Sequence, residues 1–133
     1  LVQSFDISAQ FWLGIRTLNG TVDSEYIMFQ QESGEVQQWE CSSQSIVHTY
    51  THSDLLLDIV ITSDDKNIMY CSSEKFVYGW FVNERTQKWK MPHPEANFIY
   101  LVPSSDNKKL MSNAYGPYVF VIDCEKGEDQ SNF

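Results

Sequence analysis

The segment His52–Trp80, HSDLLLDIVITSDDKNIMYCSSEKFVYGW, decides the fold class of this chain. It holds three short apolar runs, at Leu55–Ile61, Ile68–Tyr70 and Phe76–Tyr78, which are rich in branched and aromatic residues. Clusters of Ser, Asp, Lys and Glu, which favour turns, separate the runs. No apolar period of about 3.6 residues is sustained here or elsewhere in the chain. The pattern predicts short β-strands joined by tight turns, and an all-β fold overall.

The same pattern recurs along the chain. When the chain is aligned on Trp39, Trp80 and Ile122, which are 41 and 42 residues apart, it divides into three similar units. Residue types agree in all three units at six positions before these anchors. These are Ile15, Leu56 and Phe98; Leu18, Ile59 and Leu101; Asp23, Asp64 and Asp106; Ile27, Ile68 and Leu110; Met28, Met69 and Met111; and Val36, Val77 and Val119. Chance would produce only one or two such agreements, so the spacing indicates a structural repeat.

The middle unit has an ordered set of residues at fixed spacing, namely His52, Leu56, Ile59, Ile61, Asp64, Ile68, Glu74, Val77 and Trp80. In this order and spacing the unit resembles the repeat of the WD-repeat β-propeller family. The terminal Trp-Asp pair is altered in every unit, to Trp39-Glu40, Trp80-Phe81 and Ile122-Asp123. The resemblance implies three four-stranded antiparallel blades of about 40–45 residues each. It also implies a buried polar tetrad, which transfers only to the middle unit, with glutamate in place of the usual aspartate: His52, Ser72, Glu74 and Trp80.

We expect residues 1–133 to form one partial propeller, with units at approximately 1–40, 41–82 and 83–125. Each unit would begin with an outer strand and end with the strand that holds the anchor residue. Residues 126–133 would be an acidic end or the start of a next outer strand. A closed propeller needs about 4–8 blades, and three are available here. The ring is therefore expected to be completed by missing residues of a longer protein or by another chain.

Composition and charge limit the classes of partner. The chain has 133 residues, of which 42% are hydrophobic, and 18 acidic side chains against nine basic ones give a net charge of −9. This charge argues against direct binding of nucleic acid, and no apolar run reaches the roughly 18 residues of a membrane span. The three cysteines, Cys41, Cys71 and Cys124, favour free thiols. Free thiols predict an intracellular location, in the cytoplasm or at the cytoskeleton or cilium rather than secreted.

Signals for catalysis are weak. The sequence has no phosphate-binding loop, nucleophile elbow or metalloprotease motif, so we expect no catalytic residue, metal site or cofactor. His48 and His52 have the spacing of a metal-ligand pair on a helix, but the residues between them favour a strand. One alternative is a propeller enzyme, such as a metal-dependent hydrolase with its site at the central channel. Such a site would need His, Asp or Glu in the first strand of several units, and Asp58 of the middle unit is the one acid found there. A two-sheet β-sandwich is a weaker alternative, because it does not explain the repeat spacing.

The family resemblance implies a non-catalytic scaffold that binds other proteins within a larger intracellular assembly, cytoskeletal or ciliary assemblies included. In the middle unit, the loop before the first strand and the turn before the third should share one rim, and the third unit extends it. The residues of this predicted protein-binding rim are Asp54, Ser73, Glu74, Lys75, Asn97 and Tyr115. Aromatic residues are favoured interface anchors, so Tyr115 is the first to test. The acidic charge favours basic protein partners, whose association would slow as salt is raised.

Overall fold

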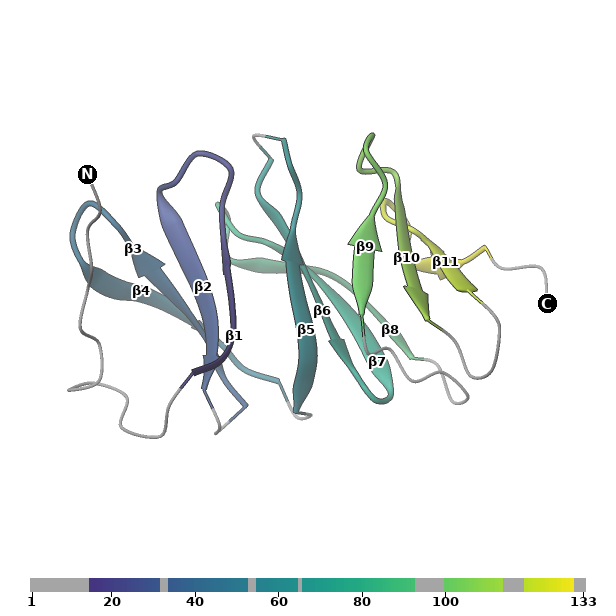
Figure 1. The fold of residues 1–133 in the computed structure, drawn as a ribbon, viewed down its shortest axis with the longest axis horizontal. Helices are drawn as coiled ribbons and strands as arrows, with labels where there is room; N and C mark the ends of the chain where they lie inside the picture. The colour runs from purple at the N-terminus through teal and green to yellow at the C-terminus, as the bar shows by residue number, and fades with distance from the viewer. Residues whose placement is uncertain are drawn as a thin grey trace.

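The chain folds into three four-stranded antiparallel β-sheets in the computed structural model, which describes residues 15–31, 34–52, 55–64, 66–92, 100–113 and 119–130. Strands that are consecutive in sequence lie side by side in each sheet (Figure 1). The first sheet comprises β1 (Ile15–Gly20), β2 (Tyr26–Gln31), β3 (Val36–Glu40) and β4 (Ser45–Tyr50). The second comprises β5 (Leu56–Ile61), β6 (Ile68–Ser73), β7 (Phe76–Phe81) and β8 (Thr86–Pro92). The third comprises β9 (Leu101–Pro103), β10 (Lys109–Asn113), β11 (Val119–Asp123) and β12 (Glu128–Asp129). The predicted all-β class and four-stranded blades are confirmed, and a two-sheet sandwich is not formed.

The sheets meet through their first strands. β1 contacts β5, and β5 in turn contacts β9, so these strands follow one another across the molecule in Figure 1. Side-chain hydrogen bonds reinforce both contacts. Asn19 Nδ2 donates to the Ile59 carbonyl at 3.1 Å, and the Leu101 backbone N–H donates to the Asp58 carboxylate at 2.9 Å. Contacts between the first strands of successive four-stranded sheets are those of neighbouring propeller blades.

Two apolar cores fill the spaces between successive sheets. The core between the first and second sheets contains Met28, Val36, Tyr50, Leu56, Ile59, Met69, Cys71, Tyr78 and Val82. The core between the second and third sheets contains Ile68, Tyr70, Val77, Met91, Leu101, Leu110, Phe120, Ile122 and Cys124. Alternate residues of β6 enter opposite cores, because successive side chains of a strand point to opposite faces. The middle sheet is therefore apolar on both faces.

Each of the first two sheets takes its fourth strand from the following sequence unit. β4 pairs with β3, and β8 pairs with β7, although the repeat places β4 in the unit 41–82 and β8 in the unit 83–125. A sequence unit is thus divided between two neighbouring sheets. This division ties successive sheets together through the chain itself.

The second strand of the middle sheet, β6, is displaced by one residue from the repeat alignment. Trp80 pairs with Met69, whereas the anchors Trp39 and Ile122 pair with Ile27 and Leu110. The structural equivalent of Ile27 and Leu110 is therefore Met69 and not the residue before it. The repeat alignment matched Ile68 to Ile27 and Leu110, and Met69 to Met28 and Met111. Both matches are wrong by one residue for the middle unit.

A difference in turn length causes this displacement. The hydrogen bond that closes the turn between β5 and β6 runs from Thr62 N to Ile68 O, whereas the corresponding bond of the first sheet runs from Thr21 N to Tyr26 O. The middle turn therefore contains one more residue. Because a shift of one residue exchanges the two faces of a strand, Met69 points toward the first sheet.

One hydrogen-bond motif builds all three turns between first and second strands. A hydroxyl group donates to the carboxylate two residues later at 2.5, 2.8 and 2.6 Å, in the pairs Thr21–Asp23, Thr62–Asp64 and Ser104–Asp106. The same carboxylate accepts a backbone N–H two residues further on. The hydroxyl hydrogen bonds hold the pKa of Asp23 and of Asp106 below the usual range of aspartate. The aspartates that recur in the repeat are thus turn-forming residues. The hydroxyl residues two positions earlier recur in the same way, and the sequence repeat described above does not include them.

Candidate interaction surfaces

His52 and Trp80 form a polar contact at the margin of the first core. Trp80 Nε1 donates to His52 Nε2 at 2.9 Å, and the two rings meet edge to face with centroids 5.5 Å apart. The His52 ring also lies edge-on to Tyr78, at 4.6 Å. This contact links the connection between β4 and β5 to strand β7, and so fixes the position at which the chain enters the second sheet.

The other two residues of the predicted tetrad lie elsewhere. Ser72 pairs with Val77, whose side chain enters the core on the far side of the sheet from Trp80. The Ser72 hydroxyl is buried and makes no hydrogen bond within the described part of the chain. Glu74 is exposed in the turn between β6 and β7. The structure therefore brings together His52 and Trp80, but not all four residues, because the displacement of β6 turns Ser72 to the opposite face.

The predicted protein-binding rim is partly described. Ser73 forms the turn between β6 and β7, where its hydroxyl accepts the Phe76 backbone N–H at 3.0 Å. A cavity of about 290 Å³ is lined by Leu55, Leu57, Glu74 and Lys75, so the start of β5 and this turn lie at one rim. Leu55 also lies at this rim and is 43% exposed, although its place in an apolar run is typical of a buried inner strand. The remaining predicted rim residues, Asp54, Asn97 and Tyr115, lie outside the described residues.

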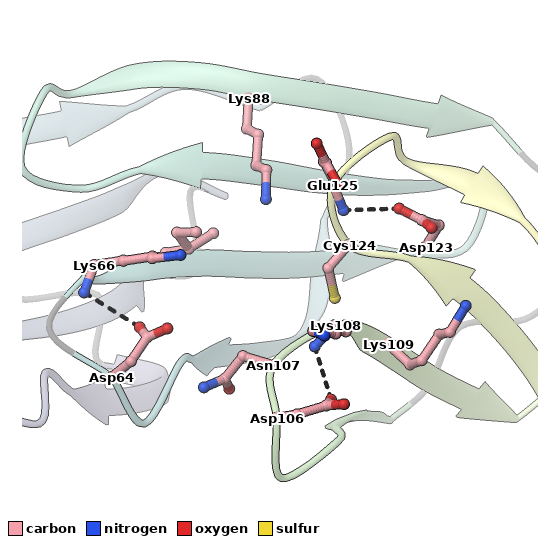
Figure 2. A pocket seen from close by; sticks show the side chains of 11 residues that line it. Asp64, Lys66, Lys88, Asp106, Asn107, Lys108, Lys109, Asp123, Cys124 and Glu125 are labelled. Carbon is pink, nitrogen blue, oxygen red and sulfur yellow. Dashed lines mark hydrogen bonds between the residues drawn. The ribbon is translucent and has the colours of Figure 1, made fainter.

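A larger cavity opens at the opposite end of the strands, between the second and third sheets. Its volume is about 610 Å³. The turn between β5 and β6, the turn between β9 and β10, the end of β11 and strand β8 all contribute to it (Figure 2). Its charged residues are Asp64, Lys66, Lys88, Asp106, Lys108, Lys109, Asp123 and Glu125.

The third sheet has an apolar face that no other described sheet covers. Its inner face supplies Leu101, Leu110 and Ile122 to the second core. On its outer face, Val102 is 54% exposed and Val119 is 56% exposed. The equivalent faces of the first and second sheets are closed by the next sheet along the chain.

Comparison with known proteins agrees with this architecture. No family model and no curated protein matches the sequence. Among solved structures, the chain is similar to U3-55K, a WD40 β-propeller protein, with a TM-score of 0.79 and 18% sequence identity. The fold is WD40-like. The match covers 90% of this chain and 38% of that one, so this chain spans well under half the length of the propeller protein.

Asp58, the acid considered for a propeller enzyme, is engaged in holding strands. Its carboxylate accepts the backbone N–H of Ile59 and that of Leu101, both at 2.9 Å. It therefore joins the first strands of two neighbouring blades. Among the described residues, no group of three or more His, Cys, Asp and Glu is placed to hold a metal ion, and no helix is long and apolar enough to cross a membrane.

The histidines and cysteines also have structural surroundings. The His48 ring packs edge-on against Tyr50, with centroids 4.5 Å apart, and burial lowers the pKa of His48. All three cysteines are free, with Cys71 and Cys124 buried and Cys41 half-buried. Burial raises the pKa of the Cys124 thiol, which keeps it protonated and poorly reactive at neutral pH.

Proposed function

We propose that this chain is part of a non-catalytic propeller scaffold that binds another protein at the rim where Leu55 meets the turn between β6 and β7. The observation behind this proposal is the exposed Leu55 side chain beside a cavity of about 290 Å³. The charged residues Glu74 and Lys75 line the same cavity. An apolar anchor point surrounded by charged groups is the usual anatomy of a protein interface.

The partner we infer is a protein with a basic surface, inside the cell. The net charge of −9 supports a basic partner, because complementary charge speeds association. The three free thiols support an intracellular setting, where cysteines stay reduced.

Leu55→Asp is expected to abolish retention of a partner protein while leaving the fold intact, because an exposed charge replaces the apolar anchor. The matched control is Val22→Asp, since Val22 is 56% exposed in the turn at the other end of the strands. Affinity purification of both variants and the parent protein, followed by mass spectrometry, compares their partners. The rim is not the binding site if both variants retain the same proteins as the parent.

We further propose that a fourth four-stranded sheet of the same kind covers the outer face of the third sheet. Val36, Val77 and Val119 hold equivalent places, each at the start of the third strand of its sheet. The first two are 0% exposed, whereas Val119 is 56% exposed. The third sheet thus presents the same apolar position that the next sheet buries in the other two cases.

Val119→Thr is expected to destabilise the intact native protein by about 1–3 kcal/mol, the usual cost of burying a hydroxyl group without a partner. Threonine has the shape of valine and suits an exposed strand, so it should cost almost nothing on an open face. Val77→Thr is the matched control, because Val77 is fully buried in the equivalent place. Thermal unfolding of the native protein measures both, and a loss for Val77→Thr alone would show that the outer face is open to water.

A further inference from the structure

The larger cavity, between the second and third sheets, is lined by four lysines and four acidic residues. Four of the nine Lys and Arg residues line it, namely Lys66, Lys88, Lys108 and Lys109. Its volume of about 610 Å³ lies within the usual range for small-ligand sites, roughly 300–1,000 Å³. It lies at the opposite rim from Leu55, and so is separate from the proposed protein-binding surface.

Lys88 is the extra residue of a β-bulge. Gly79 pairs with Trp89 and Trp80 pairs with Gln87, so Lys88 lies between the two pairs without a cross-strand partner. Bulges redirect a side chain and are frequent near functional sites. Here the Lys88 side chain extends into the cavity (Figure 2).

The Lys88 ammonium group is partly buried beside two aromatic rings, with one lysine and two carboxylates near enough to affect its pKa. It donates to the hydroxyl of Tyr70 at 3.3 Å and lies 5.7 Å from the ring centroids of Tyr70 and Phe81. Burial is the main cause that lowers the pKa of Lys88; the carboxylates of Glu125 and Asp123 oppose this, and the like charge of Lys66 adds to it. Lys66, which is exposed, and the partly buried Lys88 thus line one cavity, where an anion between their ammonium groups would be attracted by both.

Three of the four acidic residues of the cavity, Asp64, Asp106 and Asp123, hold their own turns through their carboxylates, and Glu125 is the fourth. The Asp64 carboxylate accepts the Thr62 hydroxyl and the backbone N–H of Lys66, and Asp106 has the equivalent pair of hydrogen bonds. The Asp123 carboxylate accepts two backbone N–H groups at 2.9 Å. These contacts occupy carboxylate oxygens. An ammonium group has three hydrogens, so Lys88, which donates one to Tyr70, can still donate to a ligand.

The equivalent place between the first and second sheets shows that the fold does not require these lysines. One repeat earlier, Val47 is the bulged residue in place of Lys88, and Glu25 stands in place of Lys66. There, Asn67 Nδ2 donates to Asp23 Oδ2 and to Asn83 Oδ1, both at 3.2 Å. Asn107 Nδ2 likewise donates across the boundary between the second and third sheets, to Ser63 at 3.3 Å. The two boundaries therefore differ in the lysines at these two positions and not in the asparagine contact.

We propose that this cavity binds a small polyanion with two or more phosphate or carboxylate groups, which the ammonium groups of Lys66 and Lys88 would contact. Lysine suits this role because its ammonium group donates several charged hydrogen bonds from a flexible stem. The partly buried position of Lys88 strengthens its attraction for an anion relative to a fully solvated lysine.

The test is isothermal titration calorimetry of the full chain with tripolyphosphate and, separately, with citrate at constant ionic strength. Lys88→Met keeps the apolar stem and removes the charge, and it should weaken binding by about tenfold, as expected for loss of a charged hydrogen bond. Lys66→Gln should weaken it similarly, and this exposed position carries little risk to folding. Binding of tripolyphosphate alone would assign phosphate as the ligand group, and binding of citrate alone would assign carboxylate.

Lys90→Met is the matched control. Lys90 belongs to the same strand and also lies over an aromatic ring, 4.1 Å from the centroid of Phe76, but it does not line the cavity. It changes the net charge equally and should leave the dissociation constant within about twofold. Equal weakening by Lys88→Met and Lys90→Met would show that only overall charge matters. No heat of binding for either probe at concentrations on the order of 10 mM would also overturn the proposal.

Discussion

Trp80→Ala is expected to lower the free energy of unfolding by about 3–5 kcal/mol, the usual cost of removing a packed tryptophan side chain. The indole packs against the core between the first two sheets and meets the Tyr50 ring at 5.1 Å. Its Nε1 atom donates to His52 at 2.9 Å. The substitution would leave both a cavity and a histidine without its donor. Equilibrium urea unfolding of the full chain measures the loss.

Two further variants separate the packing of Trp80 from its hydrogen bond. Trp80→Phe keeps an aromatic ring and loses the donor, so it should cost about 1–2 kcal/mol. In the His52→Ala background, Trp80→Phe should cost less than in the parent, because its hydrogen-bond partner is already absent. A loss below about 1 kcal/mol for Trp80→Ala would contradict the packing role of the indole.

The strand order follows from local sequence signals. Short apolar runs separated by turn residues predict a meander, and Asp23, Asp64 and Asp106 lie in the predicted turns because each organises its turn through its own carboxylate. Such features depend on residues within one unit, so a single sequence contains the information for them. The repeat spacing then predicts that three similar sheets follow one another.

The register of β6 could not be predicted in the same way. It depends on a turn that contains one additional residue and on Asn67, which adopts a left-handed backbone conformation with φ 51°. Asparagine tolerates this conformation better than most residues, but its presence does not specify the length of the turn. The slip of one residue turned Ser72 away from Trp80, which is why the transferred tetrad does not assemble as a unit.

The candidate site residues were hard to predict because their positions depend on neighbouring sheets. Leu55 belongs to an apolar run, yet its side chain is exposed in the folded chain. Lys88 is directed into a cavity by a bulge, which alternation of residue types does not reveal. Trp89 lies in the fourth strand of its sheet, yet it donates its indole N–H to the Cys124 carbonyl of the next sheet at 2.7 Å.

Gly127→Ala is expected to be the other large loss, at about 2–4 kcal/mol, because overpacking and a left-handed backbone conformation combine there. Gly127 has φ +68°, and an added Cβ would lie 2.5 Å from Cδ2 and 2.6 Å from Cγ of Trp89. The indole has little freedom to move. It stacks on Tyr70 at 5.4 Å and is held by its hydrogen bond to Cys124. Thermal unfolding of the full chain would detect the loss.

The indole of Trp89, rather than the backbone, is what demands glycine at position 127. Gln44 and Arg85 occupy the same place in the other two turns with φ 54° and 61°, so side chains are tolerated in this conformation. In the Trp89→Ala background, Gly127→Ala should therefore cost only about 1 kcal/mol, the backbone contribution alone. An equal loss in both backgrounds would assign the requirement to the turn itself. A smaller loss without the indole would show that Trp89 and Gly127 fit together as a pair, joining the turn of the third sheet to the second.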